Sequence, residues 1–200
     1  VIIPTASDKV DLKEAPSELR PYRFANLSIL HTTDREEADS DKFVAPLKEA
    51  TGVWFVGGQQ HRIANAYLGT AVEREVYEVL KRGGVVSGTS AGAAIQSRVM
   101  IAGGNPKPEI ATGFDLLPGA IIDQHFTQRK RQPRLKAALQ QHPDLLGIGI
   151  DEDTAIAVIG DVSEVMGRNS VHVYGGEQEV KAFSAGKQFD LKKRTSVDQK

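Results

Sequence analysis

The chain has 200 residues, of which 40% are hydrophobic and 26% charged, a composition typical of a globular domain and not of a disordered chain. Its 25 Lys and Arg nearly balance 26 Asp and Glu, and the net charge of -1 argues against nucleic acid or an anionic membrane as the main partner. The absence of Cys excludes disulfides, thiolate metal sites and a Cys nucleophile. No apolar run approaches the roughly 20 residues that a membrane-spanning helix needs.

Strands and helices are expected to alternate along the first three quarters of the chain. Short apolar runs that end in Gly or small polar residues predict buried strands in residues 1–7, 27–31, 52–56, 85–87, 120–123 and 147–151. Apolar residues at helical spacing predict helices in residues 34–50, 63–68, 72–81, directly after 92 and in 128–140. Residues 103–119, with four Gly and three Pro, are expected to form a long loop.

Short strands joined by turns are expected from Thr154 onward, in residues 154–159, 164–166, 171–174 and 180–183. Apolar strands that alternate with helices predict an α/β fold with a mostly parallel sheet and helices on both faces, followed by C-terminal β-hairpins. On length, we expect a single domain over residues 1–200. Functional sites of such sheets form at the carboxyl ends of the strands.

Ser90 is the candidate nucleophile, because Gly88-Thr89-Ser90-Ala91-Gly92 is a G-x-S-x-G pattern between a predicted strand and a predicted helix. A tight strand-to-helix turn exposes the Ser hydroxyl, and the flanking Gly residues relieve crowding. The N–H of Ala91 is then a candidate oxyanion donor. The alternative interpretation is a Gly-rich connection with an incidental Ser.

His125 is the preferred general base, since it directly follows the predicted strand 120–123 and so belongs to the same sheet edge as Ser90. His31 also ends a strand and is the reserve candidate. The other three histidines are expected in structural positions. His61 would begin a helix, His142 would be a helix C-cap, and His172 would lie in a late hairpin.

Glu152 is the preferred acid to orient the base, because it follows another predicted strand. Its neighbours Asp151 and Asp153 are each compatible with a solvated turn. Three other acids stay open as rivals: Glu109, Asp115 and Asp123.

Two further features complete the predicted site. The turn Gly57-Gly58-Gln59-Gln60 ends a strand and can supply a second oxyanion N–H, or it can be a plain strand-to-helix connection. A basic cluster follows His125: Arg129, Lys130, Arg131, Arg134 and Lys136. Such a run is usually a solvated helix face, but its position beside the proposed base favours recognition of substrate carboxylates.

These motifs, taken together and in this order, resemble the cyanophycinases, serine exopeptidases of the peptidase family S51 with a flavodoxin-like fold similar to that of class I glutamine amidotransferases. The likeness covers roughly residues 1 to 160 and includes the opening Ile2-Ile3-Pro4-Thr5-Ala6-Ser7. The family's N-terminal strand and Gly-rich loop before this segment have no counterpart in the sequence, and the loop at 103–119 is shorter than usual in the family.

The resemblance implies a role for each matching residue. Ser90 would be the nucleophile, His125 the base and Glu152 the third triad member, with the N–H groups of Gly58 and Ala91 as the oxyanion hole. The substrate pocket would be lined by Gln60, Asp123, Gln124, Arg129, Arg131 and Arg134. The implied substrate is cyanophycin, a poly-aspartate chain with Arg joined to each β-carboxyl, and the implied product is the β-Asp-Arg dipeptide.

Other expectations are less specific. The resemblance implies a homodimer. Because the His residues are scattered and there are no Cys ligands, no metal is expected, and no cofactor is expected either. A cytoplasmic location is expected, with a secreted form left open. Three alternative functions stay open: another S51-like peptidase such as an Asp-specific dipeptidase, an inactive peptide-binding homologue, and an α/β-hydrolase esterase. The esterase would place its acid before the His, at Glu109 or Asp115.

Overall fold

A computed structural model describes residues 1–10, 12–14, 19, 21–22, 24–175 and 178–197. Packing divides the chain into two compact units, one made of residues 1–96 with 112–116, the other of residues 97–111 with 117–200. The expectation of a single domain over residues 1–200 stays a prediction.

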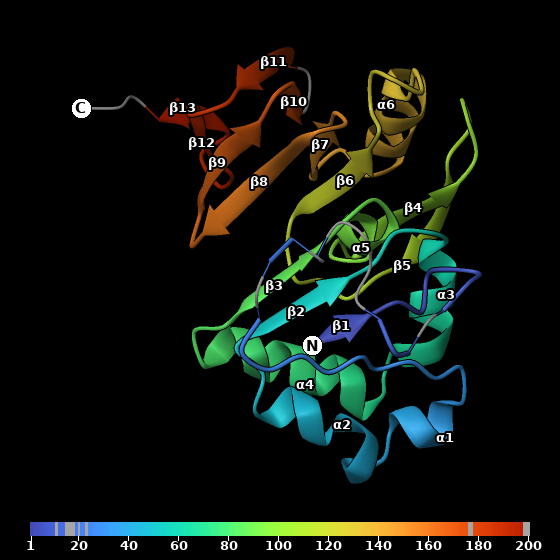
Figure 1. Ribbon diagram of the computed structural model, residues 1–200. Coiled ribbons are helices and arrows are strands. Elements are labelled where there is room, and N and C mark those ends of the chain that lie inside the picture. The colour runs from blue at the N-terminus through green and yellow to red at the C-terminus, as the bar shows by residue number, and fades with distance from the viewer. Residues whose placement is uncertain (11, 15–18, 20, 23, 176–177, 198–200) are drawn as a thin grey trace. The chain divides into compact units, whose positions relative to one another are not determined.

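The first unit is built on a three-stranded parallel sheet in the order β1-β2-β3 (Figure 1). Its strands are β1 (Ile2–Ile3), β2 (Gly52–Phe55) and β3 (Val85–Gly88). Phe55 is paired with both Ile3 and Gly88, so the three strands end at one edge. Its helices are α1 (Arg35–Ala38), α2 (Asp41–Lys48), α3 (Gln60–Tyr67), α4 (Ala71–Lys81) and α5 (Ala91–Ala94).

Helix α4 shows how the spacing of apolar residues predicts a helix in this unit. Its apolar stripe is buried, with Val72, Val76 and Val79 almost without exposed surface. Gly83 follows the helix with a φ of 83°, a left-handed conformation that Gly adopts without strain. The helix predicted over 72–81 is confirmed.

The second unit contains two four-stranded sheets and a two-stranded one. The sheet that carries the candidate site has the order β11-β10-β7-β6, with β6 and β7 parallel and the other pairs antiparallel. Its strands are β6 (Ala120–Gln124), β7 (Leu146–Ile150), β10 (Ser170–Gly175) and β11 (Gln178–Ser184). The other sheet, in the order β13-β12-β9-β8, consists of β8 (Thr154–Ile159), β9 (Val162–Gly167), β12 (Gln188–Asp190) and β13 (Thr195–Val197).

A buried cluster anchors β6 and β7 against helix α6 (Gln132–Gln141). It consists of Ile101, Ile121, Phe126, Leu135, Ala138 and Tyr174. Phe126, the residue after His125, is fully buried and meets Tyr174 edge-on at a ring-centroid distance of 5.7 Å. The chain after β6 is thereby fixed to the core one residue beyond the candidate base.

Three local predictions are wrong. The segment 103–119 is not one long loop, because β4 (Val99–Gly103) and β5 (Glu109–Thr112) form a hairpin around its Gly- and Pro-rich part. The helix expected over 128–140 begins at Gln132, where Pro133 suits the first turn. Residues 27–31 form a single bridge, from Ile29 to Ile2, and no strand.

The α/β fold class is confirmed, with parallel strands in both units and antiparallel C-terminal hairpins. Strands β12 and β13 extend these hairpins beyond the prediction. Within the described residues, no helix has both the length and the apolar character to cross a membrane. The same residues contain no group of three or more His, Cys, Asp or Glu suited to a metal ion.

Candidate active site

Ser90 lies on the sharp turn between β3 and α5, as predicted from its motif. Its φ of 51° and ψ of -108° lie outside the regions that a non-Gly residue usually adopts, which costs on the order of 1–3 kcal/mol. The flanking Gly residues make the turn possible. A Cβ on Gly88 would lie 2.5 Å from the carbonyl carbon of Gly92, and one on Gly92 would lie 2.1 Å from the Phe55 oxygen.

The Gly57-Gly58 turn at the end of β2 lies beside Ser90. A Cβ placed on Gly57 would lie 3.4 Å from the Cβ of Ser90. Gly58 has a φ of 139°, and a side chain there would overlap the carbonyl oxygen of Ala6 at 2.1 Å. The close approach of Gly58 to Ala6 requires a Gly there, and the contact of Gly57 with Ser90 sets the two turns side by side. This arrangement places Gly58 and Ala91, the two predicted oxyanion donors, on turns that adjoin in the first unit.

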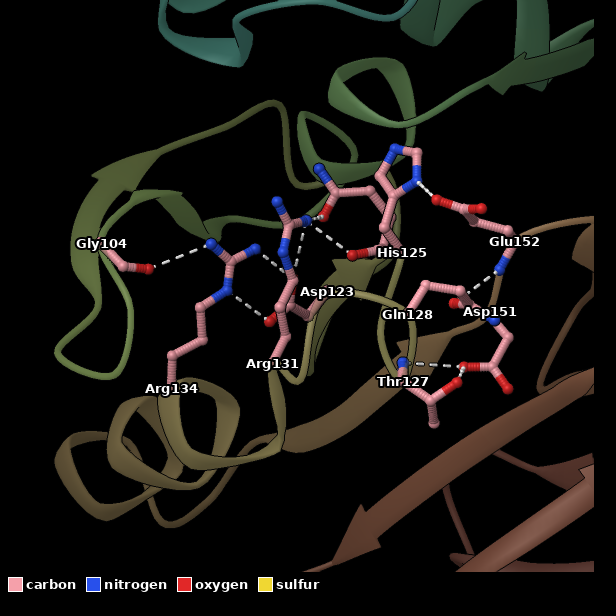
Figure 2. A network of polar contacts seen from close by, with 10 residues as sticks. Gly104, Asp123, His125, Thr127, Gln128, Arg131, Arg134, Asp151 and Glu152 are labelled. Carbon is pink, nitrogen blue, oxygen red and sulfur yellow. Dashed lines mark hydrogen bonds and ion pairs between the residues drawn. The ribbon is translucent and has the colours of Figure 1, made fainter.

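His125 and Glu152, both in the second unit, are brought together. The Nδ1 of His125 lies 2.7 Å from Oε1 of Glu152, and Figure 2 shows the two side chains pointing toward each other. The pairing of Gln124 with Ile150 aligns the ends of β6 and β7, so the chains leave the sheet side by side. Because a carboxylate only accepts hydrogen bonds, Nδ1 donates, and Nε2 of the neutral ring carries the lone pair of a general base.

The rival acids have other positions. Asp123 is fully buried and engages the Arg134 guanidinium, whose Nε lies 2.7 Å from Asp123 Oδ2. Glu109 lies on β5 and Asp115 belongs to the first unit. Asp153 is exposed in the turn after β7, as predicted. Among these carboxylates, Glu152 is the one whose oxygen lies within hydrogen-bond distance of the His125 ring.

The basic cluster divides into a buried part and an exposed part. Arg134 is 5% exposed, and it also donates to the carbonyl oxygen of Gly104 at 3.1 Å (Figure 2). Arg131 is partly buried, and its Nη1 donates to the backbone and side-chain oxygens of Gln124 at 2.6 and 3.0 Å. Arg129 and Lys136 are exposed. A solvated helix face, the simpler reading of this cluster, therefore does not describe Arg131 and Arg134.

Burial and the neighbouring Arg134 lower the pKa of Arg131 to about 10, although Asp123 acts in the opposite direction. The guanidinium still carries its charge at neutral pH. A cation that is partly desolvated interacts more strongly with an incoming carboxylate than one in bulk water does. Any interaction of Arg131 with a carboxylate is therefore screened less by water than one made by the exposed Arg129.

We expect Arg134→Met to destabilise the chain by about 3 kcal/mol, because it leaves the Asp123 carboxylate buried with only the more distant Arg131, 3.6 Å away. Urea denaturation would measure the free energy of unfolding. Lys136→Met, on the exposed face of the same helix, serves as the control and should change it by under about 0.5 kcal/mol. Equal stability of the two variants would show that the Asp123–Arg134 pair is not needed for folding.

The remaining histidines have structural positions in their own units. His31 accepts or donates a hydrogen bond with Thr5 Oγ1 at 3.0 Å, and burial and the nearby Arg62 lower its pKa. His61 is in the first turn of α3 and His142 is the C-cap of α6, as predicted. His172 lies on β10, with Nε2 3.3 Å from Asp151 Oδ2. Gln60 is buried at the start of α3.

Asp151 is the site residue that the sequence analysis missed. The prediction of a solvated turn is wrong for it, since its surface is 7% exposed and it accepts hydrogen bonds from Thr127. The run of three acids after a buried strand was the available signal. The sequence gives no means to decide which of three consecutive acids turns back toward the chain after β6.

Comparisons with known proteins identify the family of the chain. The model of peptidase family S51 matches residues 1–166, and the chain belongs to this family. It is 40% identical over 157 residues to a cyanophycinase of Nostoc sp., which covers 74% of this chain and 52% of the relative. It is 36% identical over 183 residues to a cyanophycinase of Synechococcus elongatus, covering 86% and 57%. The chain thus spans about half the length of these curated relatives.

A solved structure shows the same fold. The crystal structure of a peptidase from an acI-B1 Actinobacterium has a TM-score of 0.72 and 27% sequence identity, and the match covers 94% of this chain and 82% of that one. The predicted resemblance to family S51 is therefore confirmed by sequence and by fold.

Proposed function

We propose that the protein is a serine exopeptidase that hydrolyses cyanophycin to β-Asp-Arg dipeptides, with Ser90, His125 and Glu152 as its catalytic triad. The observation that carries the proposal is the hydrogen bond of 2.7 Å from His125 Nδ1 to Glu152 Oε1, in a chain of family S51 whose relatives include cyanophycinases. The strained conformation of Ser90 on the sharp turn between β3 and α5 supports its role as the nucleophile.

In the proposed mechanism, Ser90 Oγ attacks the backbone carbonyl carbon of the scissile aspartyl bond while His125 Nε2 takes the hydroxyl proton. The N–H groups of Gly58 and Ala91 stabilise the negative oxygen of the tetrahedral intermediate. The C–N bond then breaks, and His125 returns the proton to the leaving amine. Water, deprotonated by His125, attacks the acyl-enzyme in the second half, which releases the acid product and restores the Ser90 hydroxyl.

Glu152 stabilises the imidazolium that forms in each half-reaction and keeps Nε2 as the basic nitrogen. Its side chain is 47% exposed, so water attenuates its electrostatic effect. Orientation of the ring is therefore its main contribution.

For substrate binding, we propose that Arg129 and Arg131 hold the carboxylates that free aspartyl ends present. Gln60 and Gln124 are the proposed amide contacts. Asp123 and Arg134 form a buried ion pair that supports Arg131. The distance from Asp123 Oδ1 to Arg131 Nη1 is 3.6 Å. A homodimer and a cytoplasmic location stay predictions.

The test is incubation of the protein with purified cyanophycin and mass analysis of the released products. We expect β-Asp-Arg dipeptides from the wild type, and a lower kcat/KM for Arg131→Gln because a carboxylate contact is lost. Cleavage of Asp-containing dipeptides without cleavage of cyanophycin would replace the proposal by an Asp-specific dipeptidase. Intact substrate throughout, together with failure of a fluorophosphonate to label Ser90, would favour a peptide-binding homologue.

A further inference from the structure

Asp151 is a buried carboxylate that lies next to the proposed triad without belonging to it. Oδ1 accepts hydrogen bonds from Thr127, 3.0 Å from the amide nitrogen and 2.7 Å from Oγ1. Oδ2 lies 3.3 Å from His172 Nε2. Burial by itself would raise the pKa of Asp151, but the hydrogen bonds from Thr127 and the contact with His172 outweigh it, and the pKa lies below its usual value. The folded structure therefore favours the charged carboxylate of Asp151.

These contacts join the chain after β7 to the chain after β6 at a second point. Glu152 contacts the ring of His125, and its neighbour Asp151 contacts the backbone and hydroxyl of Thr127, two residues after His125 (Figure 2). The side chain of Gln128 adds a third link, because its Oε1 accepts from the Glu152 N–H at 3.1 Å. Two consecutive acids thus hold the ring and the backbone of one short segment.

His125 needs such support, because its φ of 49° is left-handed, a conformation that costs a non-Gly residue about 1–2 kcal/mol. The Phe126 N–H donates to the Ile150 oxygen at 3.1 Å, and its ring packs on Gly149, where a Cβ would lie 2.4 Å away. This fixes the segment directly after His125. The Asp151–Thr127 hydrogen bonds fix the next residue. The backbone after His125 therefore cannot shift to relieve the left-handed conformation of His125.

We infer that Asp151 is a positioning residue. Through Thr127 it holds the turn after β6 in the conformation that keeps His125 Nδ1 hydrogen-bonded to Glu152. The inference rests on the proposed function only in so far as His125 is the general base. The effect of Asp151 passes through its hydrogen bonds to Thr127 and the backbone of residues 125–127.

A purely structural role would make the same contacts, so the decisive readout is the state of the His125 ring. Imidazole ¹⁵N NMR of the whole chain reports which ring nitrogen carries the proton. In the wild type we expect one dominant form, protonated at Nδ1. In Asp151→Ala and in Thr127→Val we expect a mixture of the two tautomers, because the hydrogen bond from His125 Nδ1 to Glu152 is no longer held in place.

The kinetic readout is kcat on the substrate that the wild type cleaves. We expect Asp151→Ala to lower kcat about 10- to 100-fold with little change in KM, because displacement of a catalytic group by an ångström has effects of this size. Thr127→Val should lose less, since the Thr127 amide still donates. Thr127→Ser, which keeps the hydroxyl, should restore both kcat and the Nδ1 tautomer. Asp161→Ala, an exposed acid between β8 and β9, is the matched control and should behave as wild type.

The outcomes separate this inference from the proposed function. If folded Asp151→Ala or Thr127→Val keeps the wild-type His125 spectrum and kcat, Asp151 is not a positioning residue. If Asp151→Ala does not fold, the pair Thr127→Val and Thr127→Ser decides the question. A wild type that cleaves nothing overturns the proposed function, whereas the NMR comparison still tests whether Asp151 fixes the His125 ring.

Discussion

Ser90→Ala is expected to abolish hydrolysis of cyanophycin, with a loss of turnover on the order of 10⁶-fold, the size of effect seen when a serine nucleophile is removed. The alanine side chain has no oxygen to form the acyl-enzyme, so any residual rate would come from binding and oxyanion stabilisation alone. Product release measured by mass analysis would quantify the loss. Fluorophosphonate labelling, which needs the same hydroxyl, should disappear in the variant.

The folded state should survive this substitution. Alanine at φ 51° and ψ -108° is as strained as serine, so Ser90→Ala should leave the free energy of unfolding almost unchanged. Ser90→Gly relieves the strain and should be more stable than Ser90→Ala by about 1 kcal/mol, with activity equally absent. A gain of stability on loss of function is typical of a strained catalytic turn.

Ser87→Ala is the control for removal of a hydroxyl in β3, the strand that leads into the Ser90 turn. Ser87 donates to the Val53 oxygen at 3.3 Å, and this contact belongs to the sheet and not to the proposed mechanism. The variant should keep its turnover. Hydrolysis by Ser90→Ala at the wild-type rate would remove the serine-peptidase mechanism, and equal loss in Ser87→Ala would indicate a general effect on the fold.

The parts of the site that the sequence predicts are those that depend on local chain geometry. The strand, the turn and the helix around Ser90 follow from an apolar run, two Gly residues and a small-residue segment, all within ten positions. His125 and Glu152 were found because each directly follows a buried parallel strand, and parallel neighbours end at one edge. Periodicity and strand ends therefore carried the prediction of the candidate site.

What the sequence did not predict depends on pairings between distant side chains. The basic run after His125 gives no sign that Arg134 turns inward to Asp123 while Arg129 stays exposed, because this depends on the pairing of α6 with the buried Asp123 of β6. The β4–β5 hairpin was not predicted for a different reason. Its connecting segment is rich in Gly and Pro, so the turn signal was assigned to the whole of 103–119.

Glu152→Gln is expected to lower kcat on the order of 10³-fold, the second largest effect of a single substitution here. The Gln amide can present its NH₂ to Nδ1, which moves the ring proton to Nε2 and removes the base. If its oxygen faces Nδ1 instead, the ring is oriented but the imidazolium lacks a carboxylate partner. The expected loss is below the roughly 10⁴-fold known for a buried triad Asp, because Glu152 is 47% exposed and its charge is partly screened.

Asp153→Asn is the matched control for this substitution, since it removes one carboxylate from the neighbouring exposed position. Asp153 has a φ of 54°, and Asn tolerates this left-handed conformation as well as Asp does. The control should therefore keep both its stability and its kcat. If Glu152→Gln retains full activity while Glu109→Gln or Asp115→Asn is inactive, the acid precedes the His in the chain. That order is the one found in an α/β-hydrolase esterase, and the geometry of His125 and Glu152 would then have no catalytic meaning.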